Sequence, residues 1–215
     1  MKLKSGRIKL TQTGNLPPNI IKEIYAKGYF PERWIEDGFV KIRTETDWAI
    51  IHNVKLVMVL AGLTKKANNW LSLTKKGETL LKNDNITEIF LEFLKAFTTK
   101  FSWAYNDGFQ DEKLGQIGFL YSLFLLNKYG DKEKAFKFYA DKYFLAFPSF
   151  IEFSVEDETM LGPAYYTRFF ERFALWFGFV EVKIKEEKTQ EDILFPERVK
   201  MLKSTELLNS MLKVK

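Results

Sequence analysis

The sequence predicts a mainly α-helical protein with small β-hairpins, which places it in the α+β class. The first observation is helical periodicity, since apolar side chains recur every three or four positions between residues 86 and 97. The second is a change of period, because apolar and polar residues alternate after Gly62 and again after Gly178. The third is composition: 46% hydrophobic and 28% charged residues are typical of a folded chain, and 215 residues suffice for one large domain or two smaller ones.

Glycines and prolines divide the first half of the chain. Pro17 and Pro18 suit the first turn of a helix, and Gly28 follows its end. Gly62 supplies a stop after a strongly apolar segment, and the alternation in Leu71-Ser-Leu73 then indicates a hairpin. The elements expected here are a helix over 19–26, a helical turn over 31–37, a buried helix over 48–61, a hairpin over 63–73 and a helix over 74–82.

The remainder is expected to hold further helices and a second hairpin. Asn85-Ile-Thr-Glu88 resembles a capping box and opens an amphipathic helix. Pro163 fits the first turn of a later helix that ends at Gly178, and the following residues alternate as in a half-buried strand. The expected elements are helices over 86–99, 112–129, 131–147, 163–177 and 204–213, an acidic connector over 152–158, and paired strands over 179–185 and 198–202.

The same order of elements in both halves predicts an internal duplication. In each half an apolar helix ends at a glycine, a hairpin follows, and the next helix carries a leucine pair, Leu80-Leu81 or Leu207-Leu208. Helices that lead into a two-stranded hairpin and then another helix form the winged-helix arrangement, a helix-turn-helix variant whose hairpin is the wing. We therefore expect tandem winged-helix-like modules over residues 6–84 and 111–213, joined by a helix and loop over 85–110.

Two resemblances accompany this interpretation. The string Leu71-Ser-Leu-Thr-Lys-Lys-Gly-Glu-Thr-Leu-Leu81 resembles the wing-to-helix junction of winged-helix repressors of the multiple-antibiotic-resistance type. Most of the chain also resembles a family of uncharacterised bacterial proteins, some attached to plasmid-encoded domains. That likeness is carried by Leu10-Thr-Gln-Thr-Gly-Asn-Leu-Pro-Pro18, by Trp103-Ala-Tyr-Asn-Asp-Gly108 and by the stretch from Phe138 to Pro148. It implies a shared fold and no catalytic residues.

The side-chain inventory argues against an enzyme, a metal site and a cofactor. The chain has no cysteine and one histidine, His52, so disulfides, Cys-based zinc sites and most histidine-based triads are excluded. The N-terminus has no apolar core of a signal peptide, and the longest apolar stretch, residues 117–126, is too short to span a membrane. We expect a cytoplasmic protein without membrane contact.

Charge is concentrated in the first part of the chain. Residues 1–85 carry 15 Lys and Arg against 8 Asp and Glu, whereas the whole chain has a net charge of +5. An excess of this sign suits contact with phosphate, so we expect DNA binding through the first module. The predicted phosphate contacts are Lys65, Lys66, Lys75 and Lys76, with an arm of Lys2, Lys4, Arg7 and Lys9, and the candidate base contacts are His52, Asn53 and Lys55.

Two other functions stay open at this point. The second predicted wing, residues 181–200, holds six acids and five bases and is not expected to attract phosphate. Tandem winged helices can instead serve as a scaffold for a protein partner or for homo-oligomerisation. A remote alternative is a metal-dependent nuclease, because Glu181-Val-Lys183 has the acid-x-Lys form and Asp157 and Glu171 could add carboxylates.

Overall fold

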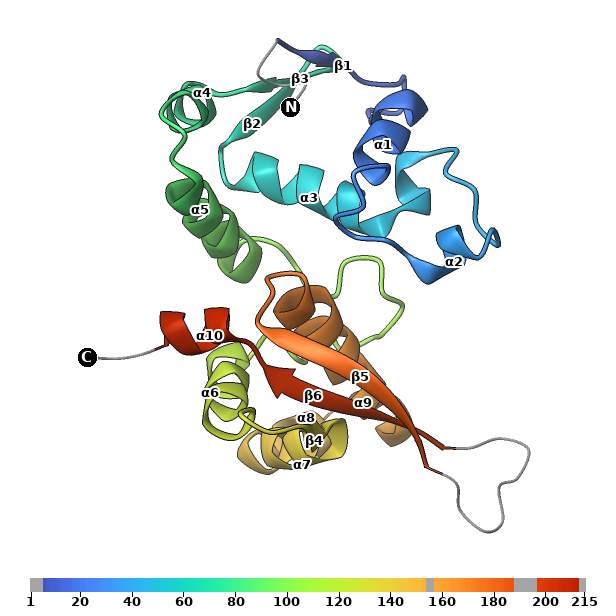
Figure 1. The fold of residues 1–215 in the computed structure, drawn as a ribbon, viewed down its shortest axis with the longest axis vertical. Coiled ribbons are helices and arrows are strands. Elements are labelled where there is room, and N and C mark those ends of the chain that lie inside the picture. The colour runs from blue at the N-terminus through green and yellow to red at the C-terminus, as the bar shows by residue number, and fades with distance from the viewer. Residues whose placement is uncertain (1–5, 154–156, 188–196, 213–215) are drawn as a thin grey trace. The chain divides into compact units, whose positions relative to one another are not determined.

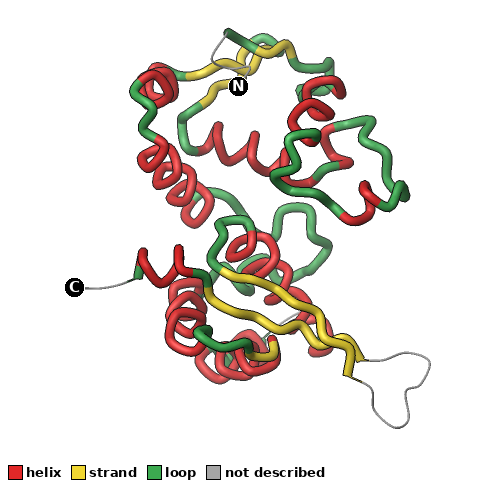
Figure 2. Tube along the Cα trace, viewed as in Figure 1, coloured by secondary structure: helices red, strands yellow, loops and turns green. Residues whose placement is uncertain are grey.

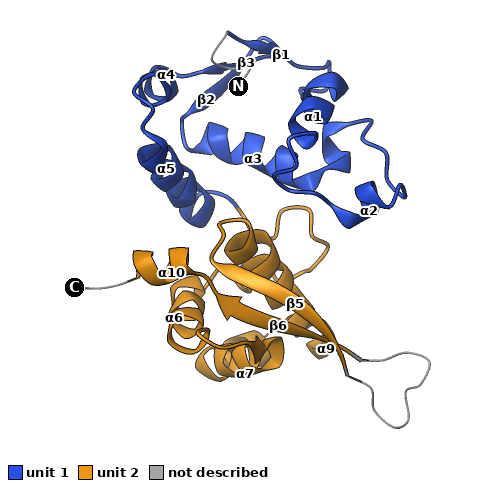
Figure 3. Ribbon diagram, viewed as in Figure 1, with its two compact units in different colours: residues 1–101 blue, residues 102–215 orange. Residues whose placement is uncertain are grey.

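The computed structural model describes residues 6–153, 157–187 and 197–212 and shows a mixed α+β fold. Helices account for 51% of the residues and strands for 13%, so the predicted predominance of helices is confirmed. The strands form two small antiparallel sheets of three strands each within the described residues (Figure 2). The chain divides into two compact units, residues 1–101 and 102–215 (Figure 3).

The first unit consists of one sheet and several helices (Figure 1). Its elements in chain order are β1 (Ile8–Lys9), α1 (Pro18–Tyr25), α2 (Arg33–Glu36), the short 3₁₀ helix η2 (Glu45–Asp47), α3 (Ala49–Leu60), β2 (Thr64–Ala67), β3 (Trp70–Leu73), α4 (Lys75–Lys82) and α5 (Ile86–Thr99). The predicted helices and the hairpin are confirmed to within a few residues. Strand β1 was not predicted, because two residues are too few to show an alternating pattern.

The second unit also combines one sheet with several helices. Its elements are α6 (Phe119–Tyr129), β4 (Lys134–Ala135), α7 (Phe136–Ala146), α8 (Ser149–Glu152), α9 (Glu158–Tyr165), the π-helix η3 (Tyr166–Leu175), β5 (Val180–Glu187), β6 (Glu197–Ser204) and α10 (Glu206–Met211). The predicted helix over 131–147 is wrong at its start, because residues 134 and 135 form a strand that pairs with β6. Part of the predicted acidic connector, residues 154–156, lies outside the described residues.

The two sheets share one topology and one register. Their strand orders are β1-β3-β2 and β4-β6-β5, so in each the last strand lies between the other two. In the first sheet Leu71 of β3 pairs with Ile8 and Lys66. In the second, Leu202 of β6 pairs with Lys134 and Val182. Leu71 and Leu202 each precede by three residues the threonine that opens the next helix, so the pairings correspond position by position.

That threonine joins three elements in each unit. The Thr74 hydroxyl donates to the Gly62 carbonyl at 2.6 Å and accepts from the Gly77 amide at 3.1 Å. The Thr205 hydroxyl donates to the Gly178 carbonyl at 2.6 Å and accepts from the Leu208 amide at 3.3 Å. Both glycines have a positive φ, 69° and 70°, which ends the preceding helix in the left-handed conformation that glycine adopts without strain. One hydroxyl thus fixes a helix end, the base of the hairpin and a helix start.

The cores of the two units differ in composition. The first is mostly aliphatic, with Ile21, Val57 and Leu63 fully or almost fully buried. The second is aromatic: the rings of Trp103 and Phe173 stack with centroids 4.6 Å apart, and those of Tyr143 and Tyr165 with centroids 4.1 Å apart. The many phenylalanines and tyrosines of the sequence are therefore concentrated as core residues in the second unit, where such pairs add to the energy of apolar burial.

Two arginines of η3 organise the loop that opens the second unit. Arg168 is fully buried and donates to Asp107 through two nitrogens, at 2.6 Å and 3.2 Å, and to the carbonyls of Phe109, Asp111 and Leu114. Arg172 donates to the carbonyls of Trp103, Tyr105 and Asn106. Burial lowers the pKa of Arg172. In a helix these backbone carbonyls would accept hydrogen bonds from backbone amides. In this loop the two guanidinium groups donate to them instead.

This arrangement corrects the predicted helix over 112–129. The helix begins only at Phe119, because Gly115 and Gly118 have φ values of +82° and +77°. Arg168 holds the turns that precede it. The prediction followed the apolar pattern and interpreted Gly115 and Gly118 as positions of close helix packing, whereas their positive φ values keep this segment out of the helix.

Pro163 is also placed differently from the prediction. It lies inside α9, which begins at Glu158 after the cap residue Asp157, and not in a first turn. A proline within a helix removes one amide donor. The Tyr166 amide bonds to the carbonyls of Gly162 and Pro163, and the chain continues in the wider π-helix η3. Such π segments are rare and are often associated with local strain or function.

The helix expected to connect two modules packs within the first unit. It is α5, which lies against α3 and α4. Lys76 of α4 and Glu92 of α5 form an ion pair at 2.6 Å, and Lys100, just after α5, donates to the Leu60 carbonyl at the end of α3. The first unit therefore extends to residue 101, beyond the predicted module boundary at residue 84.

Replacing the two junction threonines is expected to lower the stability of each unit. Thr74→Ala and Thr205→Ala each remove a helix cap and the bond to a glycine carbonyl, which costs about 1–2 kcal/mol of unfolding free energy. Urea denaturation followed by circular dichroism measures both. Thr79→Ala is the matched control, since Thr79 is exposed within α4 and alanine favours helix. Equal stability of all three variants would contradict the role of the junction.

Candidate nucleic-acid interface

The two lysines of strand β2 lie on opposite faces of the first sheet. Lys65 pairs with Ser72, and Lys66 pairs with Leu71, whose side chain is buried in the core. Successive residues of a strand alternate between faces, so Lys65 projects from the outer face and Lys66 from the inner one. The Lys66 ammonium fills the space beside Gly14 that a side chain would occupy. Lys66 is exposed but starts from the inner face, so only Lys65 of this pair projects from the outer face of the sheet.

The two lysines at the start of α4 also differ. Lys76 forms the ion pair with Glu92 described above, and its hydrogen bond to the carboxylate lowers the pKa of Glu92. Lys75 is the first residue of α4, is exposed, and forms no ion pair among the described residues. The charge of Lys76 is partly neutralised, whereas that of Lys75 remains available to an external anion.

The outer face of the first sheet gathers further positive charge around Trp70. Lys9 and Ala67 both pair with Trp70, so these residues share the face that also carries Lys65. The Arg7 guanidinium lies 4.1 Å from the centroid of the Trp70 ring, a cation–π contact. Arg7 and Lys9 belong to the predicted arm, whereas Lys2 and Lys4 lie outside the described residues. We call Arg7, Lys9, Lys65 and Trp70 the first-sheet face.

No carboxylate side chain occurs in the segments that build this face. Residues 1–22 and 48–77 contain no Asp or Glu, and these segments include all three strands of the sheet. The strands of the sheet and the residues beside them in sequence therefore add no negative charge to this face. Trp70 was not named from the sequence, although its alternation with the buried Leu71 places it on the outer face.

Two of the three candidate base contacts, His52 and Lys55, lie in a buried polar network, and the third, Asn53, is buried. Glu45 is fully buried, and its Oε1 lies 2.5 Å from both His52 Nδ1 and Lys55 Nζ. Its Oε2 accepts a hydrogen bond from the Leu16 amide, also at 2.5 Å. Lys55 donates in addition to the Gly14 carbonyl at 3.1 Å. Asn53, on the same helix, is 4% exposed.

This network attaches the loop before α1 to helix α3. The carboxylate satisfies the Leu16 amide, and the ammonium satisfies the Gly14 carbonyl, so both polar groups and charges are compensated inside the unit. The His52 and Lys55 side chains of α3 face this network. That His52, Asn53 and Lys55 contact bases stays a prediction, and the geometry gives His52 and Lys55 a structural task.

The residues named for a nuclease do not come together as a metal site in the described part of the chain. Lys183 Nζ contacts Glu133 Oε1 at 2.6 Å, and Lys185 contacts the other oxygen at 2.9 Å. These bonds lower the pKa of Glu133 to about 2. Among the described residues there is no group of three His, Cys, Asp or Glu side chains that could hold a metal ion. Glu181, Asp157 and Glu171, all within the described residues, therefore do not form such a group.

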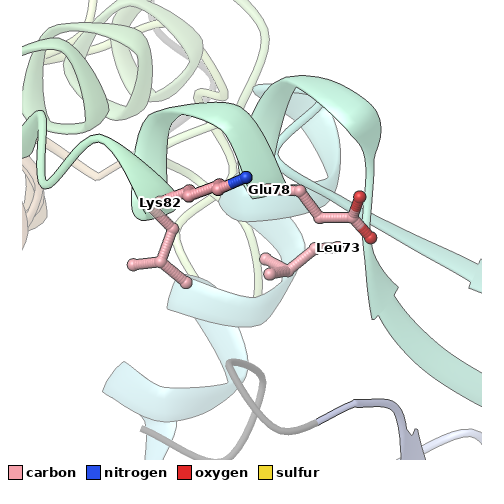
Figure 4. A pocket seen from close by; sticks show the side chains of 4 residues that line it. Leu73, Glu78 and Lys82 are labelled. Carbon is pink, nitrogen blue, oxygen red and sulfur yellow. The ribbon is translucent and has the colours of Figure 1, made fainter.

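An open pocket of about 370 Å³ lies beside α4 (Figure 4). Leu73, Glu78, Leu81 and Lys82 line it, which gives two apolar side chains, one acid and one base. This lining offers a single cation, Lys82, and so no cluster of donors for a phosphate. None of the described helices is long and apolar enough to cross a membrane.

Comparison of the chain with protein-family models, with curated proteins and with solved structures found no match. The resemblances drawn from short sequence strings therefore remain predictions.

Removing the buried Glu45 carboxylate is expected to destabilise the first unit. Glu45→Gln leaves the Lys55 ammonium buried without a counter-charge, which costs about 3–5 kcal/mol of unfolding free energy. The double variant Glu45→Gln/Lys55→Met, which removes both charges, is expected to recover part of that loss. Chemical denaturation measures both, with the exposed Glu88→Gln as control. Additive losses in the double variant would show that the two charges are not coupled.

Proposed function

We propose that the chain is a non-enzymatic nucleic-acid-binding protein that contacts DNA phosphates through the first-sheet face. The observation that carries the proposal is the cluster of Arg7, Lys9 and Lys65 around Trp70, in segments without a single carboxylate. Lys75 extends the positive charge to the start of α4. Cations of this kind supply most of the affinity of proteins for DNA and steer association.

The proposal includes two winged-helix-like modules that arose by internal duplication. Its support is the common strand order of the two sheets, their matching register, and the threonine that joins a helix end, the hairpin and the next helix in each unit. In this arrangement β2 and β3 form the wing of the first module. A wing with outward lysines suits the DNA backbone, in agreement with the position of Lys65.

The binding we propose is largely independent of sequence. Base readout in the major groove requires several exposed Arg, Asn or Gln side chains. In α3, His52 and Lys55 instead face the Glu45 carboxylate, and Asn53 is buried. Contacts from Arg7, Lys9, Lys65 and Lys75 would reach phosphate oxygens, which carry no base identity. The affinity should therefore depend steeply on salt and weakly on DNA sequence.

The triple variant Lys9→Ala/Lys65→Ala/Lys75→Ala tests this surface. The slope of log affinity against log salt is expected to fall by about 0.9 for each lysine that contacts a duplex phosphate. Fluorescence anisotropy with two labelled duplexes of unrelated sequence, titrated at low and near-physiological salt, measures the slope and the sequence dependence together.

The matched control is Lys22→Ala/Lys27→Ala/Lys41→Ala, which removes three exposed lysines of the same unit outside the first-sheet face. An equal fall of the slope in both variants would indicate a net-charge effect and reject the face as the site. Absence of binding by the wild-type protein at low salt would reject the proposed function.

A second candidate function, self-association, is supported by a different surface. The connection between α1 and α3 exposes several large apolar side chains, with Trp34 65% and Phe39 73% exposed. Their rings contact each other with centroids 5.8 Å apart, and Tyr29 and Phe30 lie nearby in the sequence. Exposed apolar patches of this kind often mark interfaces. A second copy of the chain would bury this segment in a symmetric dimer.

Static light scattering distinguishes this candidate. A protein that self-associates through this segment should show twice the monomer mass at high concentration, and Trp34→Ser/Phe39→Ser should return it to the monomer. Leu145→Ser/Phe153→Ser is the control, because both replaced side chains are equally exposed but lie in the second unit. A wild-type monomer at all concentrations would rule out this function.

A further inference from the structure

Three lysines of the second unit surround a pair of aromatic rings. Lys128 lies near the end of α6, Lys134 in β4 and Lys142 in α7. The rings are Tyr129 and Phe138, which meet edge to face with centroids 5.3 Å apart. These five residues, which we call the lysine–aromatic cluster, come from three elements that are contiguous in the chain between residues 119 and 146.

The ammonium groups lie close together because they share rings. Lys134 and Lys142 each lie 5.0 Å from the Phe138 centroid, so their nitrogens are separated by no more than twice that distance. Lys128 and Lys142 each lie 5.3 Å from the Tyr129 centroid. Lys142 therefore contacts both rings and links the cluster. Successive phosphates of one strand in a duplex are about 3.4 Å apart along the axis, so ammonium groups this close together can contact the same or neighbouring phosphates.

The contacts hold the lysines without neutralising them. A cation–π contact attracts the ammonium to the ring but leaves its full charge, whereas an ion pair cancels it. None of the three lysines forms an ion pair with a described residue. The neighbouring acids are engaged elsewhere: Glu133 with Lys183 and Lys185, and Asp141 with Lys137 at 2.7 Å.

One acid in this segment, Asp131, forms no ion pair with a described residue. Asp131 is exposed, precedes β4, and its charge contributes to the raised pKa of the buried Tyr139, whose main cause is burial. A single carboxylate stands against three uncompensated ammonium groups and the exposed Lys132. The local charge is therefore positive, although the second unit as a whole is not basic.

We propose that the lysine–aromatic cluster is a second phosphate-binding site, which holds the backbone of a nucleic-acid strand. The inference rests on the proposed function for the kind of ligand but concerns a different surface and a different unit. Three ammonium groups held on two rings lose less side-chain entropy on binding than three free lysines would, because their stems are already restrained. The cluster supplies ammonium donors for the same or neighbouring phosphates. Its residues belong to α6, β4 and α7 and not to the second hairpin.

The sequence alone pointed away from this surface. The balance of acids and bases in residues 181–200 suggested that the second wing would not attract phosphate. The structure adds two features that a count cannot provide: Lys183 and Lys185 of that wing neutralise Glu133, and the lysines of the preceding segment converge on the two rings.

The double variant Lys134→Gln/Lys142→Gln tests the site, because glutamine keeps part of the stem and removes the charge. Anisotropy titrations of the full chain use a labelled single-stranded oligothymidylate and a labelled duplex. Loss of two phosphate contacts should reduce affinity by roughly tenfold to a hundredfold near 0.1 M salt and lower the salt slope. Phe138→Leu, which keeps both charges but removes a ring, should reduce affinity by a smaller factor. Circular dichroism checks that each variant is folded.

The control Lys113→Gln/Lys203→Gln removes two exposed lysines of the same unit. If it weakens binding as much as the cluster variant does, the cluster is not a site. If only the triple variant of the first-sheet face loses affinity, this inference fails and the proposed function stands. Loss in the cluster variant alone supports the inference and rejects the first-sheet face. Binding of anionic vesicles through the cluster without binding of either nucleic acid would also overturn the inference.

Discussion

The hydroxyl of one threonine in each unit is the interaction on which the rest of the fold depends. Thr74 and Thr205 each bond the carbonyl of a glycine that ends one helix and cap the helix that follows the hairpin. The hairpin that lies between each glycine and its threonine must therefore have its two ends side by side. Once the ends are fixed, the register of the hairpin follows, and with it the face to which each strand residue belongs. The outward position of Lys65 and the inward position of Lys66 follow from this constraint.

Both units use buried charge to hold irregular backbone, and they do so with opposite signs. In the first, the Glu45 carboxylate receives the Leu16 amide and the Lys55 ammonium, which keeps the loop before α1 against α3. In the second, the guanidinium of Arg168 binds Asp107 and several carbonyls of the loop before α6. A buried charge without its partner is costly, so each group favours a single loop conformation. The loops in turn position β1 and α6, which carry cations of the two proposed surfaces.

The lysine and arginine side chains of the two proposed surfaces have a similar environment. Arg7 lies on Trp70 in the first unit, and Lys128, Lys134 and Lys142 lie on Tyr129 and Phe138 in the second. In both cases an aromatic ring restrains the cation and leaves its charge for an external anion. Lys76, Lys183 and Lys185 show the contrasting state, since carboxylates already pair with them. Whether a carboxylate already pairs with a lysine, more than where that lysine lies in the sequence, therefore decides whether the lysine is a candidate contact for an external anion.

The sequence by itself determined the class of fold, most helices, both hairpins and the stops at Gly62 and Gly178, because local periodicity and the positive φ of glycine are encoded by neighbouring residues. It also identified Lys65, Lys75, Arg7 and Lys9 as cations of the basic region. Only the tertiary structure decided that His52 and Lys55 face a buried carboxylate, that Lys76 is paired, and that β1 and β4 complete the sheets. These outcomes depend on contacts between residues distant in the chain. Burial and pairing arise from such contacts, and no local pattern of residues records them.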